Sequence, residues 1–290
     1  MKIKHVAIAF FALALGLSQC RQPVLPEYDI EELKDISFTA YGGGGSKGDF
    51  TDSDGNLTFT WDADDVLHVY VCKKRDSFDP ATGRYLGSLK NTTGEGSTAS
   101  FFGRVRVKKD DEYFRFVYVG KNFSVNDSGE STLDYSSQTG ILDNGSNGLG
   151  EQVLAYIDMP YSEDMGGKMN VYGAIFAFDL TSFSTGTVTM SNAGYHKITL
   201  NKDGGIVPSE DGDVTLTLAD INDKDKYCTI LLPTTNPVTI TFSKSGETTR
   251  YVSVKSISES KYYTSENGSG IKPLTGFSSG DLDSEFEDGF

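Results

Sequence analysis

Few residues of this chain combine the type and spacing that catalysis or metal binding requires. Beyond the first nineteen residues the histidines are His68, which alternates into an apolar run, and His196, which precedes Lys197 in a predicted turn. The chain contains no HExxH or P-loop motif, and no CxxC pair or Cys/His cluster offers a zinc site. The sequence therefore predicts no enzyme, no metal and no other cofactor, although paired carboxylates stay open in so acidic a chain.

Two aspartate-rich segments have the composition of calcium loops without the spacing. In Asp49 to Gly55, Phe50 occupies the place of the first EF-hand ligand. We expect this segment and Asp220 to Asp225 to be turns, where aspartate and asparagine are common.

Cys20 is the residue whose position most clearly predicts covalent chemistry. It follows a basic head, Met1 to His5, and an apolar run, Val6 to Leu17, that is too short to span a bilayer and is typical of an export signal. A cysteine in this place resembles the lipobox of bacterial lipoproteins, although Gln19 stands where a small residue is preferred. The resemblance implies cleavage before Cys20 and attachment of acyl chains such as palmitate, of which two or more hold a protein stably on a membrane. An ordinary secreted protein cut nearby is the alternative.

The charge of the mature chain limits its partners. Cleavage before Cys20 removes Lys2 and Lys4 and leaves 24 basic against 41 acidic residues, a net charge of about −17. Such a surface repels phosphates, so we expect neither nucleic acid nor anionic headgroups as partners.

Two further cysteines lie in separate strand-like runs, Val69 to Cys72 and Tyr227 to Ile230. An exported protein permits a disulfide between Cys72 and Cys228. Two separate buried thiols are the favoured interpretation, because the runs fall in different halves of the chain.

Short apolar or alternating runs recur along the chain and predict an all-β fold. They are residues 36–40, 57–61, 66–71, 114–119, 174–178, 188–190, 197–200, 214–218, 238–242 and 250–254. The run 66–71 is nearly continuous and predicts a central strand, whereas the last two runs flank a glycine-containing loop and predict a hairpin. Only Glu27 to Lys34 has a helical period, and residues 122–151 are polar enough to predict an exposed loop. Strands at this spacing favour sandwiches over βαβ units.

The length suits two domains, with a junction at Met159-Pro160 and Gly166-Gly167. We expect a signal peptide (1–19), a tether (20–34), an N-terminal sandwich (35–160), a C-terminal sandwich (161–272) and an acidic tail or donor strand (273–290). Trp61, at a strand end, is expected to anchor the core, and a sugar-stacking platform is the alternative.

Residues 36–119 resemble the fimbrillin family, the type V pilins and pilin-like lipoproteins of anaerobic gut and oral bacteria. The resemblance rests on an aromatic strand ending in Trp and an L-x-V-Y strand (Phe59 to Tyr70), a glycine-rich approach to a Phe strand (Gly94 to Gly103), the aromatic strand Tyr113 to Gly120, and the later run Ala174 to Phe178. It implies two tandem transthyretin-like β-sandwich domains.

The resemblance also implies assembly by strand exchange. A protease cuts behind the first strand, that strand leaves, and a terminal strand of a neighbouring subunit fills the groove. The displaced strand here would carry Ile36, Phe38 and Ala40. The glycine run 42–45 precedes Lys47, the candidate cleavage site, and a plain flexible loop is the alternative.

The donor strand would come from the tail, where an extended chain would place Ser284 and Asp288 between apolar residues on one face and acidic residues on the other. Leu282, Phe286 and Phe290 share one face and are the candidate donor residues. A solvated acidic tail is the alternative, and it would fit an anchor, tip or accessory subunit better than a stem subunit.

These features together predict a fimbrial subunit or fimbria-associated adhesin, held in the outer membrane by a lipid and exposed at the cell surface. Its expected partners are other fimbrial subunits and a host or bacterial surface receptor. The alternative is a glycan-binding surface lipoprotein.

Overall fold

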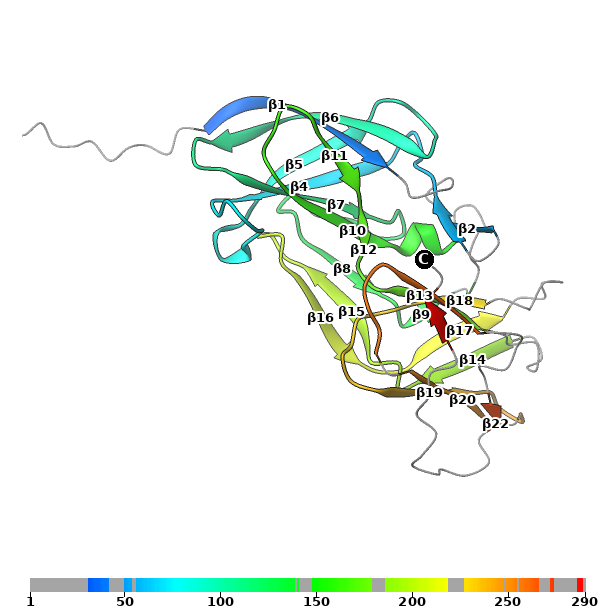
Figure 1. Ribbon diagram of the computed structural model, residues 1–290. Coiled ribbons are helices and arrows are strands. Elements are labelled where there is room, and N and C mark those ends of the chain that lie inside the picture. Colours follow the sequence, from blue (N-terminus) through cyan, green and yellow to red (C-terminus); the bar gives the residue numbers. More distant parts are fainter. Residues whose placement is uncertain are drawn as a thin grey trace, which may run out of the picture. The chain divides into compact units, whose positions relative to one another are not determined.

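The computed structural model describes residues 31–41, 50–53, 56–138, 140, 148–178, 186–218, 227–247, 249–254, 256–265, 272–273 and 286–288 (Figure 1). Over these residues the regular structure is β-strand, apart from the short 3-10 helices η1 (Pro80–Thr82) and η3 (Leu149–Gln152). The all-β prediction is confirmed. No helix in this part of the chain has the length and apolar character to cross a bilayer.

Eight strands form the first sheet, in the order β11-β1-β6-β5-β4-β7-β10-β12. They are β1 (Glu31–Tyr41), β4 (Val66–Cys72), β5 (Arg84–Asn91), β6 (Thr98–Lys108), β7 (Tyr113–Val119), β10 (Leu154–Pro160), β11 (Met165–Lys168) and β12 (Asn170–Val171). The ring of Phe38 on β1 stacks on that of Phe116 on β7 at 4.3 Å, although three strands separate β1 from β7. The sheet therefore curls until its inner face packs on itself, as in a sandwich.

The remaining strands form smaller sheets, ordered β18-β13-β21-β23, β22-β20-β19-β14-β17-β9 and β16-β15-β8, and the hairpin β2-β3. Their bounds are β2 (Phe50–Ser53), β3 (Asn56–Phe59), β8 (Ser131–Asp134), β9 (Ser137–Gln138), β13 (Ala174–Phe178), β14 (Gly186–Ser191), β15 (Tyr195–Leu200), β16 (Ile206–Asp211), β17 (Val214–Leu218), β18 (Tyr227–Leu231), β19 (Val238–Ser243), β20 (Arg250–Val254), β21 (Lys261–Ser265), β22 (Lys272–Pro273) and β23 (Phe286–Asp288).

β13 is buried on both faces, which explains its unbroken apolar sequence. Ile175 and Ala177 pack into the hydrophobic cluster of the first sheet. Ala174, Phe176 and Phe178 pack into a second cluster built from β14, β17, β19 and β20. This strand therefore links the two cores.

The predicted strands are present, and β4 is central, between β5 and β7. The predicted hairpin is β19 with β20, paired from Val238 opposite Val254 to Phe242 opposite Arg250. Both cysteines are buried thiols: Cys72 is 0% and Cys228 is 1% exposed, and neither forms a disulfide within the described chain.

Three local predictions were wrong. β1 begins at Glu31, so residues 31–34 are strand and neither helix nor tether. Residues 122–151 include β8, β9 and η3, and Tyr135 and Leu149 there are 1% exposed. His196 lies inside β15 and not in a turn. The residues around it form a strand that pairs with β8 and β16.

Strand pairing crosses the expected boundary between residues 160 and 161. β11 and β12 follow that boundary in sequence but pair with β1 and β10 of the first sheet. β8 and β9 precede it but pair with β15 and β17. The two-domain division therefore stays a prediction, and the strands do not separate at one point in the sequence.

Candidate functional site

β1, the strand expected to be displaced, lies between β6 and β11. It pairs antiparallel with β6 along its whole length, from Glu31 opposite Lys108 to Tyr41 opposite Thr98. Its residues from Phe38 to Tyr41 also pair in parallel with β11. A strand that replaced β1 would need to satisfy backbone groups on both neighbours.

The inner face of β1 carries the predicted residues Ile36, Phe38 and Ala40, each at most 1% exposed. Phe38 lies opposite Phe101 of β6 and stacks on Phe116 with an interplanar angle of 28°. Burying an Ile or Phe side chain contributes roughly 1.5–3 kcal/mol each. The loss of β1 would therefore uncover an apolar groove with Phe101 and Phe116 in its wall.

The outer face of β1 is mostly exposed, and Asp35 on that face pairs with the neighbouring strand. Arg104 donates to both carboxylate oxygens of Asp35, with Nε 2.7 Å from Oδ1 and Nη2 3.3 Å from Oδ2. This hydrogen bond lowers the pKa of Asp35. Lys34 lies in the inner row, ahead of Ile36, and its ammonium lies 3.9 Å from the centroid of the Tyr161 ring. The Asp35–Arg104 pair is exposed, so the buried face supplies most of the strand's stability.

β11 approaches β1 closely because Gly166 has no side chain. A Cβ added at Gly166 would lie 2.7 Å from the backbone oxygen of Thr39. The predicted junction glycines therefore have a packing role beside the candidate displaced strand.

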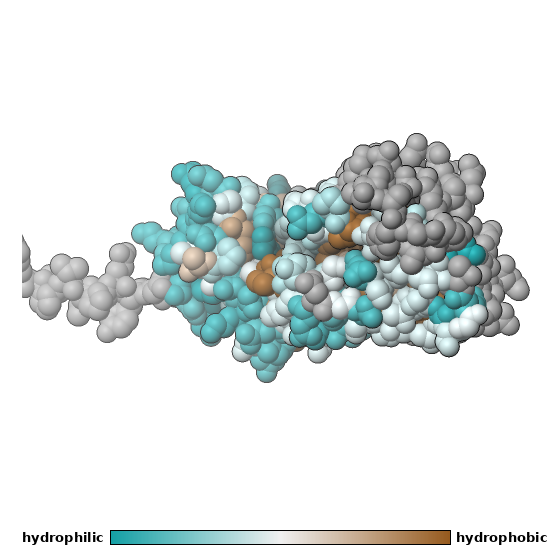
Figure 2. All heavy atoms as spheres, turned by 90° about the horizontal axis from the view of Figure 1, so that it is seen from below, coloured by the Kyte–Doolittle hydropathy of each residue, from teal (hydrophilic) through white to brown (hydrophobic). Residues whose placement is uncertain are grey.

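Among the described residues, few large apolar side chains have substantial exposure. They are Leu33, Tyr41, Phe102, Tyr195 and Val207. On the face seen in Figure 2, hydrophobic residues form small separate spots in a mainly hydrophilic surface. Isolated spots of this kind do not make a docking face.

Comparison with solved structures gives the neighbours of this fold. One is a "putative cell adhesion protein" from Bacteroides uniformis, 16% identical, which covers 88% of this chain and 98% of its own at a TM-score of 0.44. Another is the tip fimbrial protein Mfa3 from Porphyromonas gingivalis, 10% identical over 80% and 94% of the two chains at a TM-score of 0.41. A third is a fimbrial assembly protein from Parabacteroides distasonis, 11% identical over 88% and 99% at a TM-score of 0.40.

Fimbrial and cell adhesion proteins are the structural neighbours of this chain. They are the kinds of protein that the sequence resemblance names. No family model and no curated protein matches the chain.

The other predicted site residues are only partly placed. Cys20, Lys47, Leu282 and Phe290 lie outside the described residues. Phe286 begins β23, which pairs antiparallel with β21, Phe286 opposite Ser265. Part of the candidate donor segment thus pairs within its own chain. The aspartates of the two expected turns, except Asp52, also lie outside the described residues.

Trp61 fills the core of the first sheet and is 1% exposed. Its ring makes edge contacts with Phe59, Phe101 and Tyr118. The prediction of a core anchor is confirmed, and Trp61 is not a sugar-stacking platform.

An acidic turn beside Trp61 is internally paired. Lys121 Nζ lies 2.5 Å from Asp62 Oδ2 and 2.7 Å from Asp64 Oδ1. Asp65 lies beneath them, accepts hydrogen bonds from the Asp62 backbone and the Tyr118 hydroxyl, and has its pKa raised to about 7 by burial. No group of three or more His, Cys, Asp or Glu side chains in the described chain is arranged to hold a metal ion.

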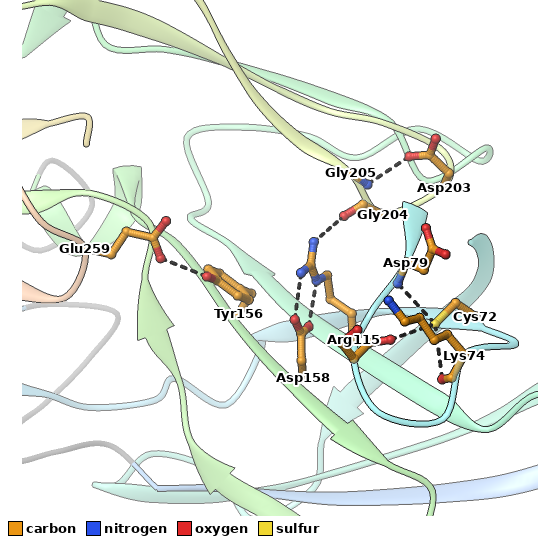
Figure 3. Close-up of polar contacts among 11 residues, drawn as sticks. Cys72, Lys74, Asp79, Arg115, Tyr156, Asp158, Asp203, Gly204, Gly205 and Glu259 are labelled. Carbon is orange, nitrogen blue, oxygen red and sulfur yellow. Dashed lines mark hydrogen bonds and ion pairs between the residues drawn. The ribbon is translucent and has the colours of Figure 1, made fainter. Parts of the chain in front are cut away.

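Arg115, which lines a cavity and joins three segments of the fold, is a residue that sequence reasoning missed (Figure 3). Its Nε and Nη2 donate to the two carboxylate oxygens of Asp158, each at 2.7 Å, and its Nη1 donates to the Gly204 carbonyl at 2.8 Å. The guanidinium lies between the rings of Phe78 and Tyr156, 4.2 and 4.9 Å from their centroids. It therefore ties β7 and β10 to the β15–β16 loop.

The local geometry of that loop requires glycine at residue 204. Gly204 has a φ of +80°, and an added Cβ would lie 2.7 Å from Phe78 and 2.9 Å from Tyr70. The signal for this junction was a charged residue inside the aromatic run Phe114 to Tyr118, but its partners lie 43 and 89 residues away in sequence.

A cavity of about 280 Å³ adjoins Arg115. Its wall includes Tyr156, Tyr172, Asn201 and Asp203, with Ile206 and Val207 as apolar members. The Tyr156 hydroxyl donates to Glu259 Oε2 at 2.8 Å, as Figure 3 shows. This is a pocket of mixed polar and aromatic character, of the kind that binds small polar ligands.

Proposed function

We propose that the protein is a fimbrial subunit or fimbria-associated adhesin, in which β1 is displaced after cleavage at Lys47 and replaced by a strand of a neighbouring subunit. The two halves act as transthyretin-like sandwiches. Its partners are other fimbrial subunits and a surface receptor. Export through the signal peptide and lipidation of Cys20 place it on the outer membrane.

The observation that supports this proposal most is the position of β1 in the chain. β1 contributes Ile36, Phe38 and Ala40 to the core, and the glycine-rich segment follows it directly. A single cut at Lys47 would separate β1 from everything that comes after it in sequence. Backbone pairing with β6 and β11, the burial of its inner face and side-chain contacts such as Asp35–Arg104 would then retain the strand.

A replacement strand needs an alternating pattern with apolar residues on one face, because Ile36, Phe38 and Ala40 in the inner row of β1 are buried whereas most of its outer row is exposed. The tail residues Leu282, Phe286 and Phe290 would share one face of an extended strand, with Ser284 and Asp288 between them. The pairing of β23 with β21 would have to be released before the tail served as a donor.

The test is limited digestion of the mature protein with a Lys/Arg-specific protease, with Lys47→Gln as the matched control. We expect one early cut at Lys47, absent in the control, and loss of residues 20–47 in mild denaturant. The stripped protein should bind a synthetic peptide of residues 31–41 but not the same peptide carrying Phe38→Asp. It should also form ladders on sizing. Retention of monomers that bind both peptides equally would contradict strand exchange.

The lipid anchor is tested separately. Cys20→Ala should move the protein from the membrane fraction to the soluble fraction, because the thiol that carries the acyl chains is gone. An unchanged distribution would refute the anchor while leaving strand exchange untouched.

A further inference from the structure

The cavity beside Arg115 presents polar groups that no other part of the described chain uses. The Asn201 carboxamide and the Tyr172 hydroxyl make no hydrogen bond with a described residue, and both residues line the cavity. Asp203 Oδ1 accepts from the Gly205 backbone at 2.8 Å, which leaves Oδ2 for a ligand. An amide, a carboxylate and a hydroxyl together supply both donors and acceptors.

The charges around the cavity disfavour an anion. Arg115 is the cation that lines the cavity, and three of its N–H groups already donate hydrogen bonds to Asp158 and Gly204. The carboxylates of Asp158, Asp203 and Glu259 outnumber it. Burial and the charge of Glu259 raise the pKa of Tyr172 to about 12, so its hydroxyl stays neutral and can donate. The fitting ligand is therefore polar and carries no negative charge.

The wall of this cavity also has aromatic and apolar members. The rings of Tyr156 and Tyr172 lie 6.4 Å apart at 53°, and Val207, 47% exposed, lies at the mouth. Aromatic rings pack on the C–H faces of a ligand while their hydroxyls reach its polar edge. A volume of about 280 Å³ is at the small end of ligand pockets and suits one ring.

We propose that this cavity binds a single neutral pyranose sugar, with Asn201, Asp203 and the Tyr172 hydroxyl on its hydroxyl groups and the Tyr172 ring against its C–H face. Asn201 donates and accepts on adjacent hydroxyls, and Asp203 Oδ2 accepts from a third. The inference goes beyond the proposed fimbrial role and does not depend on strand exchange, since no cavity residue belongs to β1, β6 or β11.

The test is saturation-transfer NMR on the mature protein with the methyl glycosides of glucose, galactose, mannose and N-acetylglucosamine. We expect at least one glycoside to bind in the millimolar range. Asn201→Ala and Tyr172→Phe should each weaken it by about 3–10-fold, the effect of one lost hydrogen bond. Tyr195→Phe and Asn236→Ala, which change the same residue types outside the cavity, should leave binding unchanged.

Thermal unfolding of each variant shows whether it is folded. If Asn201→Ala does not fold, Tyr172→Phe, which removes only one oxygen atom, still tests the proposal. Three results would overturn the proposal: no glycoside binds, the cavity variants bind as well as the controls, or lysine amide binds at the cavity in place of every glycoside. The last would assign the acidic pocket to a cation.

Discussion

His68 is a largely buried histidine in β4, and burial lowers its pKa to about 4. In the unfolded chain a histidine titrates near 6.5. Below that pH the unfolded state takes up a proton that the native state refuses. The stabilisation from neutral His68 is therefore complete above about pH 6.5. As the pH falls from there towards 4, this stabilisation is lost and the free energy of unfolding decreases by about 3 kcal/mol. Urea unfolding at a series of pH values between these limits measures the slope.

The matched variants for this prediction are His68→Gln and His196→Gln. His68→Gln should flatten the slope, because the amide does not titrate, and His196→Gln should preserve the part that His68 causes. An identical slope in the His68→Gln protein would assign the acid sensitivity to other groups.

The ion pairs Arg115–Asp158 and Arg104–Asp35 have the same chemistry in different surroundings. In each, the two residues are directly opposite on neighbouring antiparallel strands and the guanidinium holds both carboxylate oxygens. The Arg115 side chain is 13% exposed and that of Arg104 is 64% exposed. Burial therefore separates their expected contributions.

We expect Arg115→Ala to lower the unfolding free energy by about 3 kcal/mol, since it leaves the Asp158 carboxylate and the Gly204 carbonyl without their donor. Arg104→Ala should change it little, because water replaces the lost partner. Chemical denaturation of both variants measures the difference. Equal losses would show that the Arg115 junction contributes no more than a surface pair.

At this scale the sequence showed which residues were unusual but not what they contact. Trp61 was predicted as a core residue because a large apolar ring at a strand end has few other places to lie. Arg115 was not singled out from the sequence, because its role depends on Asp158 and Gly204, which the fold alone brings to it.

β1 shows how a strand's two faces differ in what they contribute. Phe38, on the inner face, is 1% exposed, whereas Phe102 of β6, opposite Ser37 on the outer face, is 46% exposed. Phe38→Ala should destabilise the protein by about 3–5 kcal/mol, the usual effect of emptying a buried phenylalanine site. Phe102→Ala should cost much less. Thermal and urea unfolding compare them, and similar losses would mean that β1 is not held by its inner row.

Alternation predicted the strands with one buried face, such as β1 and the hairpin β19–β20. It failed where the buried positions are not apolar. β8 buries Ser131 and Leu133 in alternation and β9 buries Gln138, so their short sequences are mainly polar. Both form strands because they pair with β15 and β17. β11 contains Gly166-Gly167, which indicates a turn, yet the missing side chain is what allows its approach to Thr39.

The whole molecule is less divided than the sequence indicated. The hydrophobic cluster beneath the first sheet includes Ile175, Ile198 and Ile230 from the second half, and Leu133 and Tyr135 from the segment expected to be a loop. Periodicity within a segment cannot show this, because it reveals that a face is apolar and not which sheet will cover it. A core shared in this way predicts that residues 31–265 unfold together.

Cys72 and Cys228 are natural probes of that prediction, one in β4 and one in β18. Each is at most 1% exposed, so a thiol reagent reaches it only when the surrounding structure opens. In a series of urea concentrations, pulsed alkylation followed by mass analysis should label both thiols with the same midpoint, and Trp61 fluorescence should change there too. Cys72→Ser and Cys228→Ser proteins, each with one probe, control for assignment of the labelled site. Labelling of Cys228 at clearly lower urea than Cys72 would instead mean that the shared cluster does not couple the halves. In that case the two halves would unfold separately, as a domain boundary near residue 160 predicts and as the strand pairing does not.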